Sequence, residues 1–314
     1  MNAVSAGADA VDGSRRETVV EVLARIPSFA RDDVTDVVGL DGMTNRTYRV
    51  CVGGRRVIVR MPSPGADPVV DRADELANTR VAAAEGLAPA VVHADITRHL
   101  LVTAFVDGPT LRPSDIGRGD MIERVATLLA GVHRLDGTRF GGRFDVATVI
   151  DRYREHLAAV GVAIGAEDAA LLRCTLRLCA TLASSAATVP CHIDPWPSNI
   201  IDAGDRLVLV DWEYSAVGDP VWDLAHFVVE ADLHADQTAR LLRAWHGGPP
   251  SRRMRARLTL WLPVTHVVWG LWARVQHAGG NDLIDLQAYA TRRLRRARQL
   301  LADDATAEAL RALS

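Results

Sequence analysis

Three oxygen-bearing side chains, Asp194, Asn199 and Asp211, stand at the two ends of a predicted β-hairpin. Two short apolar runs, at residues 199–201 and 207–210, are separated by a glycine-containing turn, a pattern typical of a small hairpin. Asp194 precedes the first run, Asn199 begins it, and Asp211 directly follows the second. Because a short hairpin returns the chain to where it began, we expect these three side chains to meet in a small volume.

This combination fits phosphoryl transfer, in which a carboxylate orients and deprotonates the attacking hydroxyl and Mg²⁺ is held against a triphosphate. Mg²⁺ is bound by hard oxygen ligands, including one or two carboxylates. Asp194 is therefore the predicted base, and Asn199 and Asp211 are the predicted metal ligands. Each residue alone has a simpler explanation, as a turn cap, a loop residue or the end of a strand. We favour the kinase interpretation because the pattern H-x-D-x₄-N, a hairpin and an Asp occur together.

The bulk composition leaves room for two lobes, because the chain has 314 residues, of which 48% are hydrophobic and 24% charged. A net charge of −3 gives no electrostatic reason to expect a nucleic-acid partner. All 36 Lys-or-Arg positions are Arg, and the four cysteines form no C-x-x-C pair, which suits a reducing compartment. Residues 1–13 lack a signal-peptide pattern and the apolar runs are too short to span a membrane, so we expect a cytoplasmic protein with no membrane partner.

Residues 17–106 are predicted to form an N-terminal lobe that covers a nucleotide, preceded by a flexible leader at residues 1–16. The apolar spacing predicts helices at 17–29 and 71–86 and strands at 34–40, 48–52, 57–61, 90–93 and 100–106. The loop between the first two strands would lay Gly42, Thr44 and Asn45 over phosphates. For this loop alone, a surface hairpin turn is the simpler explanation.

Arg60 lies on the third predicted strand, where a kinase fold places its phosphate-pairing Lys. Because the chain contains no Lys, an Arg must take that role, and its planar guanidinium suits bidentate phosphate contact. Glu75, one turn into the following helix, is the predicted partner of Arg60. Taken in isolation, Glu75 is better explained as part of a solvated helix face.

A break at Asp107-Gly108-Pro109 marks the predicted lobe boundary, with Phe105 and Asp107 in a hinge against which an adenine base would rest. Beyond it, residues 107–314 are predicted to form the catalytic and substrate-binding lobe. Helical spacing is found at 120–134, 146–160, 168–183 and 252–301. The expected fold class is α+β, a two-lobe protein-kinase-like fold with a small antiparallel N-terminal sheet and a larger, mainly helical C-terminal lobe.

Several stretches together resemble the choline/ethanolamine kinase family, within the aminoglycoside-phosphotransferase-like kinases, and most of all its bacterial phosphocholine-forming branch. The matching residues run from about Gly39 to Arg293 and comprise 42–48, 59–62, Asp71-Arg72 with Glu75, 192–195 with Asn199, 211–214, Asp219-Pro220, 222–225, 269–272, Gln276 and Tyr289. The resemblance implies that Asp194 is the base, that Asn199 and Asp211 hold Mg²⁺, and that Arg60 and Glu75 position phosphate. It also implies an amino-alcohol pocket formed by Glu213, Tyr214, Glu230, Trp269 and Trp272, and a homodimer, which choline kinases often form.

An aromatic pocket is physically reasonable for such a substrate, because a quaternary ammonium has no N–H to donate. Aromatic faces hold it instead, each contact contributing about 0.5–2 kcal/mol. Trp269 and Trp272 are three residues apart, so both rings would emerge on one helix face, although core packing explains two Trp residues equally well. The chain departs from the family at Ile193, where Asn is usual, and after Glu230, where aromatic residues are missing, and this bears on the substrate more than on the reaction.

We therefore expect an ATP- and Mg²⁺-dependent phosphotransferase that acts on the hydroxyl of a small cationic alcohol, with choline favoured. One alternative is a kinase for ethanolamine, thiamine or an antibiotic of the aminoglycoside type. Another is a nucleotide-binding protein that no longer turns over, against which the intact Asp194, Asn199, Asp211, Arg60 and Glu75 argue.

Overall fold

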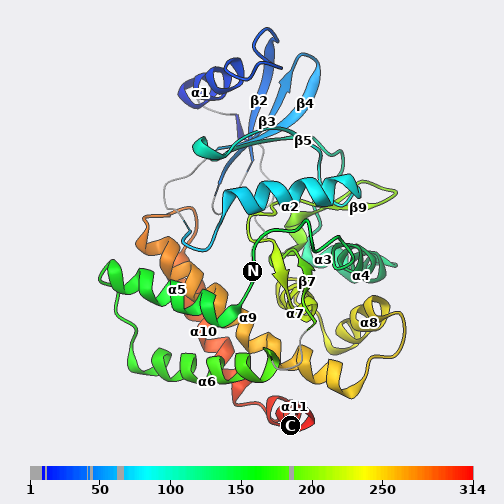
Figure 1. Cartoon of the computed structure of the whole chain (residues 1–314), viewed down its shortest axis with the longest axis vertical. Coiled ribbons are helices and arrows are strands. Elements are labelled where there is room, and N and C mark those ends of the chain that lie inside the picture. The colour runs from blue at the N-terminus through cyan, green and yellow to red at the C-terminus, as the bar shows by residue number, and fades with distance from the viewer. Residues whose placement is uncertain are drawn as a thin grey trace.

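The structure is a computed structural model that describes residues 9–10, 13–40, 42, 45–61, 67–183 and 187–313. It has two lobes, as predicted: a small sheet-containing lobe and a larger, mainly helical lobe, with helix α2 running between them (Figure 1). The fold class expected from the sequence is therefore confirmed.

The N-terminal lobe is built on a six-stranded antiparallel sheet in the order β1-β2-β3-β4-β6-β5. Its strands are β1 (Asp9–Ala10), β2 (Val34–Leu40), β3 (Arg46–Val52), β4 (Arg55–Met61), β5 (Val91–Asp95) and β6 (Leu100–Ala104). Helix α1 (Gly13–Ala24) lies beside the sheet, and Val19 and Leu23 pack on Val50 and Val59 in a small hydrophobic core. Every second residue of β3, namely Tyr48, Val50 and Val52, is buried, so this strand presents one face to the core.

The expected leader at residues 1–16 contains two described segments: β1 pairs with Val38 and Gly39 of β2, and α1 begins at Gly13. Residues 1–8, 11 and 12 lie outside the described residues. The predicted strands at 34–40, 48–52 and 57–61 are present as β2, β3 and β4. The tight turn between β3 and β4 holds Gly53 and Gly54, both at positive φ, which glycine adopts without strain.

Helix α2 (Arg72–Ala84) is attached to both lobes. The Asp71 side chain accepts hydrogen bonds from the backbone N–H groups of Ala73 and Asp74 and so begins the helix. Further along, the Asn78 amide donates to the carbonyl of Ser215 at 2.9 Å and accepts from the Gly141 N–H at 2.7 Å. Because Asn78 is fully buried, these bonds fix the helix, and with it Glu75, against the larger lobe.

The crossing between the lobes follows β6 and depends on Gly108. Gly108 has φ of +139°, and a Cβ there would lie 2.1 Å from the carbonyl oxygen of Asp202, so only glycine fits. The next residues run beside β8 (Ile200–Asp202): the Asp202 N–H donates to the Pro109 carbonyl at 2.9 Å, and the Leu111 N–H donates to the Ile200 carbonyl at 2.8 Å. The crossing segment is therefore tied directly to the predicted hairpin.

The larger lobe surrounds helix α9 (Arg252–Ala278), whose 27 residues contact α5, α6, α7, α10 and α11. The two-stranded pairs β7 (Val189–Cys191) with β10 (Ala216–Gly218) and β8 with β9 (Leu207–Leu209) lie above this helical core. The other helices are α3 (Pro113–Ile116), α4 (Met121–Val132), α5 (Val146–Ala159), α6 (Ala166–Ala183), α7 (Pro220–Glu230), α8 (Ala235–His246), α10 (Leu286–Leu301) and α11 (Asp304–Leu313).

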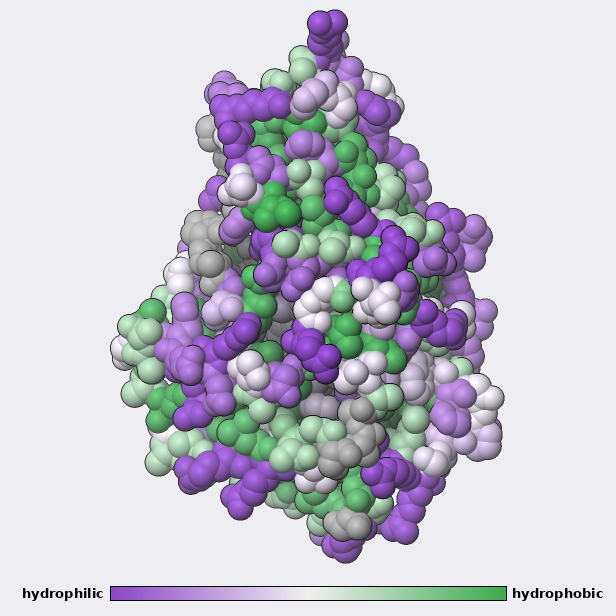
Figure 2. All heavy atoms as spheres, in the orientation of Figure 1, coloured by the Kyte–Doolittle hydropathy of each residue, from purple (hydrophilic) through white to green (hydrophobic). Residues whose placement is uncertain are grey.

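Figure 2 shows hydrophilic side chains along much of the outline of one face, with smaller groups of hydrophobic residues between them. Among the helices that the structure describes, none combines the length and the apolar character that a membrane span requires.

Candidate active site

The hairpin predicted from the sequence is present and brings its two ends together. Strand β8 pairs antiparallel with β9, with Ile200 opposite Leu209, and the Val210 N–H donates to the Asn199 carbonyl at 2.9 Å. Asp211 follows at once, so its backbone and that of Asn199 are adjacent. Burial of Ile200 and of all three residues of β9 anchors this short hairpin in the protein.

Asp194 contacts two of the side chains around it. The Asn199 amide nitrogen donates to the Asp194 carbonyl at 3.1 Å and to its Oδ2 at 3.3 Å, and His226 Nε2 lies 2.8 Å from Oδ1. The Asp194 side chain retains 15% exposure, enough to reach a reactant. Burial, and after it the charge of Glu213, raises the pKa of Asp194 well above its usual range. The predicted base is thus both positioned and more basic than a free carboxylate.

Arg60 and Glu75 form a buried ion pair, as predicted. The Arg60 Nη1 also donates to Oδ1 of Asp211 at 3.0 Å, so one guanidinium joins the sheet, helix α2 and the hairpin. Burial alone would lower the pKa of Arg60, but the carboxylates of Glu75 and Asp211 outweigh burial and raise it. The planar fork reaches two carboxylates at once, which a Lys ammonium could not do with the same geometry.

Asn45 and Glu213 are joined to each other, whereas the sequence assigned them to separate sites. The Asn45 amide donates to Glu213 Oε2 at 2.9 Å, and Arg72 Nη1 donates to the same oxygen at 2.9 Å. Arg72 also donates to Glu75 Oε2 at 2.8 Å. The physical reason is charge balance, because two buried carboxylates share Arg72 as a second cation. Gly42 is described and exposed, and Thr44 lies outside the described residues.

Phe105 and Asp107 follow β6, where the hinge was predicted, and both contact Arg56 of β4. The Arg56 guanidinium lies 4.6 Å from the centre of the Phe105 ring and donates to Asp107 Oδ2 at 2.7 Å. The Phe105 N–H donates to the Arg56 carbonyl at 3.2 Å, which extends the sheet into the hinge. The Asp107 carboxylate is therefore engaged in an exposed ion pair with Arg56. The backbone of Asp107 remains the candidate for contacting an adenine base.

The side chains of Asn199 and Asp211 fit a Mg²⁺ ion by their chemistry. Both offer hard oxygen ligands, and the Asn199 amide donates through nitrogen, which leaves its oxygen to coordinate. Burial and then the charge of Glu213 raise the pKa of Asp211 to about 7, despite the nearby Arg60. The carboxylates around Asp211 thus exceed the neutralising cations, an environment that a divalent cation would stabilise.

The predicted pocket residues Tyr214, Trp269 and Trp272 form one aromatic cluster together with Tyr289. Ring centres are 5.3 Å apart for Tyr214 and Trp269, 5.8 Å for Trp269 and Trp272, and 6.1 Å for Trp272 and Tyr289, all edge-to-face. Both Trp residues project from one face of α9, as expected, but they are 5% and 2% exposed. The two half-buried tyrosines therefore supply the accessible edges of the aromatic cluster.

Glu230, assigned to the cation pocket from the sequence, has a cation from this chain beside it. Arg293 donates to Glu230 Oε1 and to the Tyr289 hydroxyl, and its guanidinium lies 4.7 Å from the centre of the Tyr289 ring. Burial alone would lower the pKa of Arg293, but the charge of Glu230 outweighs it and raises that pKa. The negative charge of Glu230 is thus largely neutralised within the protein.

Four residues that sequence reasoning did not assign to the site take part in it: Arg72, Asp67, His226 and Arg293. Arg72 lies inside one of the stretches that carry the family resemblance, which is a signal for its place in the site. The others carried no periodic or motif signal, because each lies far in sequence from its partner: Tyr214 is 147 residues from Asp67, and Glu230 is 63 residues from Arg293.

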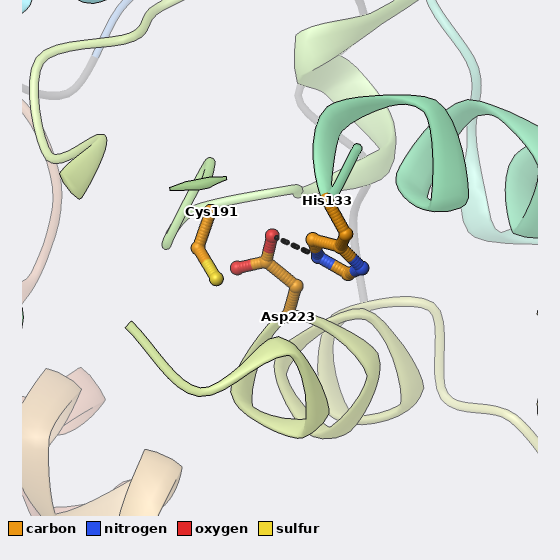
Figure 3. A group of neighbouring side chains, drawn as sticks. All are labelled: His133, Cys191 and Asp223. Carbon is orange, nitrogen blue, oxygen red and sulfur yellow. Dashed lines mark hydrogen bonds and ion pairs between the residues drawn. The ribbon is translucent and has the colours of Figure 1, made fainter. Parts of the chain in front are cut away.

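Three further residues near Asp194, which are His133, Cys191 and Asp223, could by proximity alone hold a metal ion (Figure 3). Their hydrogen bonds exclude it. The Trp245 indole N–H donates to His133 Nδ1 at 2.9 Å, so His133 carries its hydrogen on Nε2 and donates it to Asp223 Oδ2 at 3.0 Å. Neither histidine nitrogen keeps a lone pair for a metal.

Asp223 instead holds the backbone that precedes Asp194. Its two oxygens accept from the N–H groups of His192 at 2.9 Å and Ile193 at 2.8 Å. Ile193 has φ of +72°, a left-handed conformation that costs a β-branched residue energy and that Asn tolerates. The departure from the family pattern at this position is thus accommodated by two buried hydrogen bonds and by full burial of the Ile193 side chain.

Known proteins match this chain over most of its length. The model described as "Phosphotransferase enzyme family" matches residues 37–257. Protein LicA of Haemophilus influenzae is 25% identical over 270 residues, covering 82% of this chain and 98% of LicA. A crystal structure of a choline/ethanolamine kinase family protein from Mesorhizobium loti matches with a TM-score of 0.82 and 30% identity, covering 95% of this chain and 98% of that one. The structure of choline kinase LicA from Streptococcus pneumoniae, at 24% identity, has the same fold with a TM-score of 0.79, covering 92% of this chain and 99% of that one.

Proposed function

This chain belongs to the phosphotransferase enzyme family and, within it, to the choline/ethanolamine kinases, and from this premise we propose that it transfers the γ-phosphoryl group of ATP to the hydroxyl of choline. The observation that carries the proposal is that one short hairpin holds Asn199, which donates to Asp194, beside Asp211, which accepts from Arg60. Use of ATP as donor agrees with the cytoplasmic location expected from the sequence.

Each residue has a defined part in the proposed reaction. Asp194 accepts the hydrogen of the acceptor hydroxyl and aligns its oxygen for in-line attack, and its raised pKa suits this task. Asn199 and Asp211 would hold Mg²⁺, which neutralises charge on the phosphate oxygens when bound. Arg60, fixed by Glu75, supplies a positive charge at the same place. Catalysis then rests on positioning and on charge stabilisation by groups that are already in place.

The acceptor follows from the aromatic cluster beside Asp194. Trp269 links the two, because its indole N–H donates to His226 Nδ1 at 2.9 Å and His226 contacts Asp194. Aromatic faces attract a quaternary ammonium, which cannot form N–H hydrogen bonds. A polycationic antibiotic would require several free carboxylates, whereas Glu213 and Glu230 are both paired with arginines.

A panel of acceptors tests the proposal. ADP release is measured with ATP and Mg²⁺ in the presence of choline, ethanolamine, thiamine or kanamycin, and the product is identified by phosphorus NMR. We expect choline to give the highest kcat/KM, and we expect Asp194→Ala to abolish turnover, by about 10²–10⁴-fold, while calorimetry still detects ATP binding. Near-normal turnover by Asp194→Ala would remove the base from its role. Nucleotide binding without transfer to any alcohol would favour a non-catalytic protein.

A further inference from the structure

We propose that Asp67 is the counter-charge for the ammonium group of the acceptor and makes the enzyme select a methylated, quaternary ammonium over a primary one. The inference rests on the proposed function and adds a residue that none of the sequence motifs contains. It begins from a question of charge: a buried cation needs an anion nearby, and the obvious candidates are already paired.

Glu213 and Glu230 do not meet this need. Glu213 accepts from Arg72 and Asn45, and Glu230 accepts from Arg293. Each carboxylate is at least nine-tenths buried and faces a fixed guanidinium. A substrate cation beside either one would meet the arginine as well as the carboxylate, and the two contributions would largely cancel.

Asp67 lies against the aromatic cluster with a different set of partners. The Tyr214 hydroxyl donates to Asp67 Oδ2 at 2.7 Å, and the Tyr153 hydroxyl lies 3.5 Å from the same oxygen. Tyr214 in turn accepts from the Trp272 indole N–H at 2.9 Å, so the carboxylate is coupled to the ring system. In the part of the chain that the structure describes, no arginine or histidine forms an ion pair with Asp67, which remains partly exposed.

The position of Asp67 also suits a short amino alcohol whose hydroxyl lies at Asp194. The buried Tyr153 hydroxyl lies among the carboxylates: burial raises its pKa most, followed by the charge of Asp67, with Glu213 and Asp194 adding to it. Tyr214, which donates to Asp67, also packs edge-to-face on Trp269. Trp269 is joined through His226 to Asp194, so Asp67 and Asp194 stand at the two ends of one connected set of side chains. Burial raises the pKa of Asp67 itself to about 6, as expected for a carboxylate that lacks a neutralising cation.

The hydrogen bonds of Asp67 decide which ammonium it prefers. A carboxylate offers about four lone-pair sites, and here Oδ1 accepts from the Val69 N–H while Oδ2 faces two tyrosine hydroxyls. Few acceptor sites remain for the N–H groups of a primary ammonium, which would lose hydrogen bonds to water without replacement. A quaternary ammonium has no such bonds to lose and needs only the charge and the aromatic faces.

The test compares Asp67→Asn with Asp71→Asn. The first change removes the charge but keeps an acceptor for Tyr214, and the second makes the same chemical change four residues away, at a helix cap that Asn serves equally well. The acceptors are choline, ethanolamine and dimethylbutanol, the neutral isostere in which carbon replaces the nitrogen of choline. Thermal melting of both variants verifies the fold.

We expect Asp67→Asn to raise KM for choline by about thirtyfold, as loss of one partner of a desolvated charge pair does. KM for ATP and for dimethylbutanol should change less than about twofold, and Asp71→Asn should behave as wild type. An unchanged ratio of choline to dimethylbutanol in Asp67→Asn would overturn the inference while leaving the proposed function intact. If no cationic alcohol is phosphorylated by the wild type, the proposed function itself fails. If Asp67→Asn does not fold, the inference is tested by the pH dependence of the ratio of kcat/KM for choline to that for dimethylbutanol in the wild type.

Discussion

His226 donates the hydrogen on its Nε2 to Oδ1 of Asp194, 2.8 Å away, and so occupies one of the two oxygens of the predicted base. The tautomer of His226 follows from its other ring nitrogen. The Trp269 indole N–H donates to Nδ1 at 2.9 Å, so the ring hydrogen is on Nε2. Burial lowers the pKa of His226 to about 4, so the imidazole is neutral at physiological pH. A neutral donor orients Asp194 without making it less basic through a full positive charge.

Replacing His226 tests this positioning. We expect His226→Phe to lower kcat by roughly 10–100-fold, because the carboxylate is no longer held for in-line attack, while KM for ATP changes little. His226→Gln, which keeps a donor of similar reach, should restore part of the loss. His246→Phe, the same change at an exposed position at the end of α8, is the control and should leave kcat unchanged. A loss of folding stability in His226→Phe with unaltered kcat would assign His226 to packing alone.

Arg60 and Arg56 form a matched pair on strand β4, because each is ion-paired but their exposure differs. The side chains of Arg60 and Glu75 are 10% and 3% exposed, whereas those of Arg56 and Asp107 are 50% and 73% exposed. We expect Arg60→Gln to cost about 1–3 kcal/mol of unfolding free energy, because Oε1 of the buried Glu75 loses its cation while Arg72 still donates to Oε2, and to raise KM for ATP. Arg56→Gln should cost less than about 1 kcal/mol. Urea denaturation measures both, and equal losses would contradict the assignment.

Variants of two buried Trp residues on α9 can distinguish a role in the site from a role in core packing. Trp269 donates to His226, and Trp261 donates to Asp219 at 3.0 Å. Trp269→Phe should cost roughly 1–3 kcal/mol, because Nδ1 of the buried His226 loses its donor. Trp261→Phe should cost less, because Asp219 keeps Arg257 as a partner. Only Trp269→Phe should also lower kcat, and Trp269→Ala should raise KM for the cation far more than KM for ATP. Equal effects of Trp269→Ala on the two KM values would mean that the ring is purely structural.

The pH dependence of acceptor choice follows from Asp67, whose pKa is raised to about 6. The groups that face it are Tyr214, Tyr153 and Glu213. Below that pH the carboxylate is protonated and no longer attracts a cation, so KM for choline should rise as the pH falls through about 6. The ratio of kcat/KM for choline to that for dimethylbutanol should therefore fall toward acid pH, since titration of groups common to both acceptors cancels. A ratio that stays constant from pH 5 to about 8 would contradict the role of Asp67.

The same pKa has a consequence for the protein without substrate. A carboxyl whose pKa is raised on folding stabilises the folded state below its unfolded value and loses that contribution as the pH rises through the folded value. For Asp67 this window lies between 3.8 and about 6. Binding of a cation should oppose the loss, so choline should stabilise the protein against heat more at neutral than at acid pH.

The sequence predicted the order of the main elements and the hairpin between Asn199 and Asp211 because both depend on local patterns. The apolar runs around residues 200 and 209 are separated by a glycine-containing turn, a pattern that predicts one short hairpin. That hairpin by itself brings the backbone of Asn199 next to that of Asp211. The pairing of Arg60 with Glu75 was also foreseeable, since a chain without Lys has few ways to place a cation on the third strand.

Only the tertiary structure decided which charges neutralise which. Glu213 was expected to face the cation of the substrate, but it is paired with Arg72, 141 residues away. Glu230 is likewise paired with Arg293. Asp67 carries no motif, yet it reaches Tyr214 across 147 residues. Spacing along the chain predicts which side chains share a strand or a helix face, whereas the partner of a buried charge depends on how separate elements pack, because a charge acts through space and is stabilised by whichever opposite charge burial brings near.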